Sequence, residues 1–247
     1  MIILGPDELT DVQLTWPVES STVLAGARIT KFVQDQVRTP SGHLITREYL
    51  KHPGAVGVIA LDDHDRVALV RQYRHPVRHR LIEPPAGLLD VGGENFLLAI
   101  QRELAEEAGL AAGRWAVLVD LFTTPGILGE SLRIYLARDL HAVDYPDGFT
   151  LEDEEAHMDT VWASLDDLVE AVLAGRLQNP TLVSGALAAW VARERDGFVS
   201  LRTAKAAWPA REVLAERTLH QRRQLGIRRE AQRPFSLRVE QRLDAEA

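Results

Sequence analysis

Four glutamates and one arginine stand close together between Gly87 and Leu110, and these residue types at these spacings can do chemistry. The group consists of Glu94, Arg102, Glu103, Glu106 and Glu107. On a helix with about 100° per residue, Glu103, Glu106 and Glu107 share one face, because their spacing is i, i+3 and i+4. Three like charges on neighbouring turns repel one another. The pattern therefore indicates a site for a hard cation such as Mg²⁺ or Mn²⁺, which in turn binds substrate phosphates.

The alternative for these carboxylates is a solvated acidic helix face, which is common in proteins. The flanking residues favour a site. A glycine-rich loop comes before the segment, Arg102 lies inside the acidic group, and Gly109 follows at the position where a helix-ending glycine is expected. A helix is predicted over Asn95–Ala108. Its apolar stripe, which is expected to pack on a sheet, consists of Leu97, Ile100, Leu104 and Ala108.

From Glu94 to Leu110 the segment matches every specified position of the Nudix box, G-x5-E-x7-R-E-U-x-E-E-x-G-U, in which U is aliphatic. The upstream glycine departs from that pattern, because six residues rather than five separate Gly87 from Glu94. The chain thus resembles the Nudix hydrolase family. The resemblance implies an α/β/α sandwich with a mixed sheet.

A longer stretch, from about Arg47 to Leu187, resembles the ADP-ribose pyrophosphatase branch of that family, particularly its actinobacterial members. The motifs that carry this resemblance are H-P-G-A-V at 52–56, R-Q-Y-R at 71–74, E-P-P-A-G-L-L-D at 83–90, T-T-P-G at 123–126 and E-S-L-R-I-Y-L at 130–136. Pro84 departs from the pattern, since an aliphatic residue is more usual there. The resemblance implies Mg²⁺-dependent hydrolysis of the pyrophosphate bond of ADP-ribose, giving AMP and ribose 5-phosphate.

The metal ligands expected from the carboxylate chemistry are first Glu103 and Glu107. Glu106 is either a third ligand or a residue that orients the other two. The resemblance adds the backbone carbonyl of Ala86 as a ligand. Glu94 and Arg102 are predicted to form a structural pair that holds the loop against the helix.

A general base must accept a proton from the attacking water. The resemblance places it in the acidic segment L-E-D-E-E-A-H-M at 151–158, where Glu154 is the best match, Glu155 is the next and Glu152 is less favoured. Glu106 is a further catalytic candidate. The residues that the resemblance assigns to the substrate are Arg47, Arg74, Glu83 and Pro125. For Arg74 the alternative is a simple surface charge.

The elements that must position these residues follow from apolar periodicity and turn signals. Strands are predicted at 55–61, 67–73, 116–121 and 132–137, two short strands around a turn within 37–50, and helices at 165–174, 182–193 and one or two within 203–225.

The chain is expected to consist of three parts. Residues 1–50 form a small β-rich domain that the resemblance assigns to dimerisation and to completing the substrate site, residues 51–197 form the Nudix domain, and residues 198–247 form an arginine-rich extension. That extension is expected to be a solvated tail or a packed helix rather than a nucleic-acid-binding arm.

Composition limits the classes of protein. The 247-residue chain has a formal net charge of −8, which argues against a general nucleic-acid-binding surface. It contains no cysteine, so disulfides, zinc–thiolate sites and a cysteine nucleophile are excluded. The sequence has no apolar run of membrane-spanning length, and a cytoplasmic protein that does not bind membranes is expected. The predicted partners are ADP-ribose and a second copy of the chain.

Two alternatives to an ADP-ribose hydrolase remain at this stage. One is a Nudix hydrolase for another nucleoside-diphosphate sugar or a dinucleotide. The other is a non-catalytic Nudix-fold regulator that senses a ligand and binds DNA. A regulator of this kind is expected to have a damaged acidic group and a helix-turn-helix tail. In this sequence the acidic group is intact.

Overall fold

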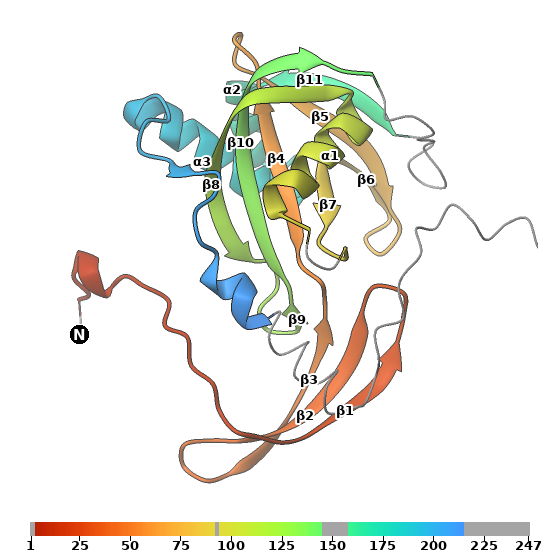
Figure 1. The fold of residues 1–247 in the computed structure, drawn as a ribbon, viewed down its shortest axis with the longest axis vertical. Helices are drawn as coiled ribbons and strands as arrows, with labels where there is room; N and C mark the ends of the chain where they lie inside the picture. The colour runs from red at the N-terminus through yellow and green to blue at the C-terminus, as the bar shows by residue number, and fades with distance from the viewer. Residues whose placement is uncertain (1–2, 92–93, 145–157, 215–247) are drawn as a thin grey trace, which may run out of the picture.

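The computed structural model describes residues 3–91, 94–144 and 158–214. It contains a large sheet between helices and a smaller N-terminal sheet that projects from one end of the molecule (Figure 1). The small sheet has the order β1-β2-β3-β9, and the large sheet has the order β11-β5-β4-β10-β8-β12, with β6 paired to β5 and β7 paired to β4.

The N-terminal sheet begins after a single 3-10 turn, Pro6–Glu8. Its strands are β1 (Val18–Gly26), β2 (Lys31–Arg38), β3 (Leu44–Lys51) and β9 (Leu128–Gly129). The first three are antiparallel neighbours, and β9 pairs in parallel with β3. The two strands predicted within 37–50 are present but reach back to Lys31. Every residue of β1 is exposed, so this strand has an uncovered surface.

The large sheet is mixed, because β4 and β10 run parallel while the other neighbours run antiparallel. Its strands are β4 (Ala55–Leu61), β5 (Arg66–Arg74), β6 (His79–Glu83), β7 (Ala86–Leu88), β8 (Leu110–Phe122), β10 (Ser131–Ala142), β11 (Asp159–Ser164) and β12 (Arg202–Thr203). The four strands predicted in this region are confirmed. The short strands β6, β7, β11 and β12 were not predicted, because each lacks a run of apolar residues.

Helices cover both faces of the large sheet. Helix α1 (Phe96–Ala108) covers one face, and α2 (Leu165–Leu173) and α3 (Pro180–Asp196) cover the other. Alternation along β4 separates the two cores: Val56 and Val58 face the α1 side, whereas Ile59 and Leu61 face the side of α2 and α3. This arrangement confirms the predicted α/β/α sandwich.

The segment after α3 corrects one expectation. Residues 203–208 were predicted to be helical, but Arg202–Thr203 form β12 and a helix begins only at Pro209. The carbonyls of Ala206 and Ala207 accept hydrogen bonds from the Arg133 side chain, so they do not serve a helix. Within the described part of the chain, no helix combines the length and the apolar character that crossing a membrane requires.

Candidate functional site

Helix α1 carries Arg102, Glu103, Glu106 and Glu107 of the acidic group, and two of these glutamates lie beside the short strand β7. Ile100 and Leu104 are fully buried against β4, which fixes the rotation of the helix. The Asn95 side chain caps the N-terminus by accepting from Leu97 N–H at 2.9 Å. Gly109 ends the helix in the left-handed region at φ 62°. The local sequence thus defines both ends of the element that presents the glutamates.

Arg102 lies at the centre of the acidic group. Its guanidinium contacts Glu94 at 3.4 Å, Glu103 at 2.9 Å and Glu106 at 2.7 Å. Burial alone would lower the pKa of Arg102, but the charges of Glu103, Glu106 and Glu94 raise it above its ordinary value. The arginine therefore stays charged and offsets part of the repulsion among the glutamates.

Strand β7 lies directly beside these carboxylates. Gly87 is so close to Glu103 that a Cβ atom on residue 87 would meet the Glu103 side chain at 2.2 Å. The Ala86 N–H donates to Glu107 Oε2 at 3.0 Å. The structure therefore brings together three predicted metal ligands: Ala86, Glu103 and Glu107. Gly87 was quoted in the sequence pattern, but its role as the surface against which Glu103 packs is visible only in three dimensions.

The donor atoms in this region fit a hard cation. They are carboxylate oxygens from α1 together with the backbone of β7, and Glu94 Oε2 is buried without a hydrogen-bond partner in the described residues. Across residues 3–91, 94–144 and 158–214, no three histidine, aspartate or glutamate side chains already form a ready-made metal site. Glu103 and Glu106 instead lie against Arg102.

The predicted substrate residues occupy two further places. Arg74 on β5 forms a two-pronged ion pair with Glu83 on β6, with its shortest contact at 2.7 Å. Glu83 is 3% exposed, whereas 44% of the Arg74 side chain is exposed, so the pair presents its cation outward. Arg47 lies on β3 and lines a separate cavity of about 290 Å³. The other residues that line it are Leu14, Trp16, Val18, Asp35, Val37 and Tyr49.

Pro125 lies in the turn between β8 and β9, where Leu128 N–H donates to Thr124 O at 2.9 Å. Beside this turn is a polar group to which the sequence assigned no role. Glu130 contacts His52 at 3.0 Å and accepts a short hydrogen bond from Thr123. Burial alone would raise the pKa of Glu130, but the hydrogen bonds from His52 and Thr123 lower it below its ordinary value. No local periodicity marks these residues, and His52 lies far from the other two in the chain.

The base candidates Glu154 and Glu155, like Glu152, lie outside the described residues. The strand that follows them is well anchored at its first residue. Asp159 contacts Arg71 at 2.8 Å and Arg80 at 2.5 Å. The next residue, Thr160, donates to the carbonyl of Glu107 at 3.3 Å. The start of β11 is thus joined both to the β5–β6 hairpin and to the C-terminal end of α1.

Comparisons with known proteins agree with this geometry. The NUDIX domain model matches residues 51–183. The chain is 43% identical to the ADP-ribose pyrophosphatase of Mycobacterium tuberculosis over 191 residues, which cover 77% of this chain and 89% of that protein. It is 31% identical to the methanol dehydrogenase activator of Bacillus methanolicus over 166 residues, which cover 67% of this chain and 87% of that protein.

A crystal structure of an ADP compounds hydrolase has the same fold, with a TM-score of 0.61 at 20% sequence identity. The similarity covers 75% of this chain and 99% of that structure. The agreement in both sequence and fold confirms the family resemblance that the glutamate spacing predicted.

Proposed function

The chain belongs to the NUDIX family, and we propose that it hydrolyses the pyrophosphate bond of ADP-ribose to AMP and ribose 5-phosphate. The observation that carries this proposal is the close approach of β7 to the intact acidic face of α1, which holds Glu107 against Ala86 and Glu103 against Gly87. Support for the substrate comes from the 43% identity to the ADP-ribose pyrophosphatase of Mycobacterium tuberculosis.

We assign Glu103, Glu107 and the carbonyl of Ala86 to a bound Mg²⁺, with Glu106 as the third carboxylate and Mn²⁺ as the alternative ion. When bound, such an ion neutralises phosphate charge and acidifies a coordinated water. The Ala86 N–H keeps Glu107 in a fixed orientation. Arg102 contacts Glu103 and Glu106 and offsets part of their mutual repulsion, and its contact with Glu94 ties the preceding loop to the helix.

We assign substrate binding to two exposed arginines, Arg74 and Arg47. Arg74 has a planar donor fork suited to a diphosphate, and buried Glu83 sets its orientation. We place Arg47 against another part of the substrate, in the cavity that it shares with Trp16 and Asp35. Asp35 Oδ1 is buried without a partner in the described residues, so it can accept a hydrogen bond from a ligand. Pro125 shapes the turn at the edge of the site.

The proton of the attacking water must reach a carboxylate. We assign this role to Glu154 first, to Glu155 second and to Glu106 third.

We further propose that the working form is a homodimer built through the N-terminal sheet, whose strand β1 is exposed along its whole length. The cytoplasmic location and the absence of nucleic-acid binding remain predictions from the sequence.

The test is AMP release from ADP-ribose with Mg²⁺, comparing the wild type with Glu107→Gln at matched folding by circular dichroism. The amide keeps an acceptor for Ala86 N–H but loses the charge. A loss of about 3 kcal/mol of transition-state stabilisation predicts a roughly 100-fold lower rate. Glu170→Gln, an exposed glutamate of helix α2, serves as the matched control and should retain the wild-type rate.

Failure to release AMP with either Mg²⁺ or Mn²⁺ would refute the ADP-ribose assignment. A panel of nucleoside-diphosphate sugars and dinucleotides would then identify another hydrolase substrate. A wild type that is inactive on the whole panel but shifts DNA in a salt-dependent way would establish the regulator instead.

A further inference from the structure

Trp208 connects the C-terminal segment to the helix that carries the acidic group. Its side chain is 2% exposed and belongs to the same buried cluster as Ile100 and Leu104 of α1. Its ring meets the ring of Phe96 edge to face, with the centroids 5.2 Å apart. Phe96 is the first residue of α1 and directly follows the capping residue Asn95. Trp208 therefore contacts the helix at its N-terminal end.

Arg133 also contacts Trp208 and holds it in place. Its guanidinium carbon lies 4.7 Å from the centroid of the Trp208 ring. Its terminal nitrogens also donate to the carbonyl of Ala206 at 2.8 Å and to that of Ala207 at 3.0 Å. Both the ring of Trp208 and the backbone just before it are thus fixed by one side chain of β10.

The Arg133 side chain is itself held by burial and by hydrogen bonds. It is 1% exposed, and its Nε and one terminal nitrogen donate to Asp120 on β8 at 2.7 and 2.9 Å. Arg202 of β12 donates to the same carboxylate at 2.7 Å. Burial alone would lower the pKa of Arg133, but Asp120 raises it above its ordinary value, so the guanidinium stays charged. A buried charge that makes four hydrogen bonds tolerates little displacement.

We propose that Trp208 is a positioning residue for the metal-binding face of α1, an inference that rests on the proposed function. The three glutamates of the helix repel one another, and their positions relative to β7 depend on how α1 is held against the sheet. Phe96 is two residues from Glu94, whose contact with Arg102 leads to Glu103 and Glu106. Trp208 resists movement at that end of the helix. Residues 202–208 thus serve the active site although they follow the domain in sequence.

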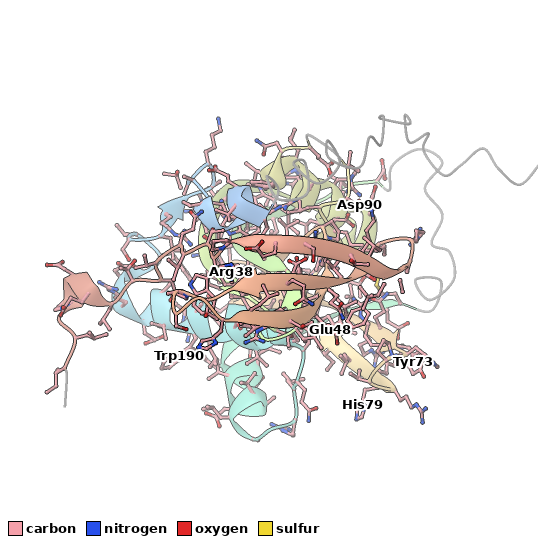
Figure 2. All side chains as sticks on the ribbon, turned by 90° about the horizontal axis from the view of Figure 1, so that it is seen from below. Arg38, Glu48, Tyr73, His79, Asp90 and Trp190 are labelled. Atoms are coloured by element: carbon pink, nitrogen blue, oxygen red, sulfur yellow. The ribbon has the colours of Figure 1, made fainter. Side chains whose placement is uncertain are left out.

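The experiment uses the full-length chain in four forms: wild type, Trp208→Ala, Trp208→Phe and Trp190→Ala. Trp190 lies on α3 beneath the other face of the sheet and on the opposite side of the molecule from Asp90, which comes just before the loop to α1 (Figure 2). Trp190→Ala therefore removes a tryptophan of the same size without touching α1. Hydrogen exchange of the amides in 96–108 and Mn²⁺ affinity by electron paramagnetic resonance are the two readouts.

Trp208→Ala should increase amide exchange in the first turns of α1 by at least about 10-fold relative to Trp190→Ala, because local opening becomes easier. It should weaken Mn²⁺ binding by about 10- to 100-fold, as loss of a supporting residue around metal ligands does. Trp208→Phe retains an aromatic ring and should restore most of both properties. In the activity assay, kcat should fall more than KM rises.

Equal exchange and equal Mn²⁺ affinity in Trp208→Ala and Trp190→Ala, even with a lower Tm, would overturn the proposal and leave Trp208 a purely structural residue. Should Trp208→Ala fail to fold, Trp208→Leu keeps most of the apolar volume and decides the same comparison. Hydrogen exchange needs neither metal nor substrate. A wild type that releases no AMP would therefore refute the proposed function, while the exchange data would still test whether Trp208 positions α1.

Discussion

Glu103 owes its position to a residue that has no side chain. The space that a Cβ on Gly87 would need is filled by the Glu103 carboxylate and the adjacent carbons. A flexible glutamate can turn away from a new methyl group at small cost, but it then leaves its place between Gly87 and Arg102. A substitution at Gly87 is therefore expected to change activity much more than stability.

Gly87→Ala should therefore lower the free energy of unfolding by about 1 kcal/mol or less, yet reduce kcat/KM by about 100-fold, since a misplacement of roughly 1 Å at a reacting group costs that much. Urea unfolding and AMP release measure the two effects. Gly26→Ala is the control, because no heavy atom lies within 4 Å of the added Cβ. A fully active Gly87→Ala enzyme would show that the position of Glu103 is not critical.

Glu130 provides a prediction about pH. Its pKa in the folded protein is lowered from the ordinary 4.5, so its ionised form stabilises the fold above pH 4.5 and that contribution is lost as the pH falls through the lower, folded-state pKa. Glu130→Gln should cost about 1–2 kcal/mol at pH 7, with the difference from wild type fading below pH 4.5. Urea unfolding at pH 7 and below pH 4 tests this.

Glu19→Gln is the matched control for that experiment. Glu19 and Arg38 pair at 2.7 Å, but their side chains are 45% and 46% exposed, so the pair contributes little at any pH. Arg38 lies on the N-terminal sheet, which crosses the underside of the molecule (Figure 2). An equal pH dependence in the two variants would contradict the role assigned to Glu130.

At the scale of elements, α1 and α3 begin in the same way. Asn95 caps α1 and Asn179 caps α3, each by accepting a backbone N–H at 2.9 Å. Replacing either cap with alanine should destabilise the protein by about 1 kcal/mol. The carboxylates assigned to the metal lie on α1, so we expect the start of this helix to affect activity as well as stability.

Asn95→Ala should consequently lower kcat and weaken Mn²⁺ binding, whereas Asn179→Ala, with a similar loss of stability, should leave both unchanged. Urea unfolding establishes that the two losses match, and AMP release with Mn²⁺ titration measures the functional difference. If both variants keep full activity, then fraying of the first turn of α1 does not reach the glutamates.

At the scale of the whole molecule, the N-terminal arm leaves apolar side chains uncovered. Ile3, Leu9, Val12 and Leu14 are 78%, 70%, 79% and 73% exposed, and Val23 on β1 is 48% exposed. An arm that extends away from the body with such side chains exposed is typical of a segment that packs on another subunit (Figure 1). This surface supports the proposed dimer.

The double variant Val12→Glu with Leu14→Glu should convert the proposed dimer into a monomer, because two charges would have to be buried in the interface. Size-exclusion chromatography with light scattering measures the mass. Val199→Glu is the control, since Val199 is 84% exposed and lies in the segment that follows α3. A wild type that is monomeric at micromolar concentration would refute the dimer directly.

The sequence alone determined the acidic helix, strand β4 and the α/β/α class. Apolar periodicity specifies which face of Asn95–Ala108 is buried, and the spacing of Glu103, Glu106 and Glu107 specifies which face is charged. These properties belong to one helix and need only nearby residues. For the same reason the predicted boundaries of α1 agree with the structure to within one residue.

Only the tertiary structure decided what surrounds that helix. The packing of Glu103 on Gly87, of Trp208 on Phe96, and of Arg133 on Asp120 joins residues that lie on different segments of the fold. Such contacts have no local period, because they depend on which strands become neighbours in the sheet. The sequence therefore predicted the chemical groups, whereas the sheet and the C-terminal segment set the positions from which those groups can act.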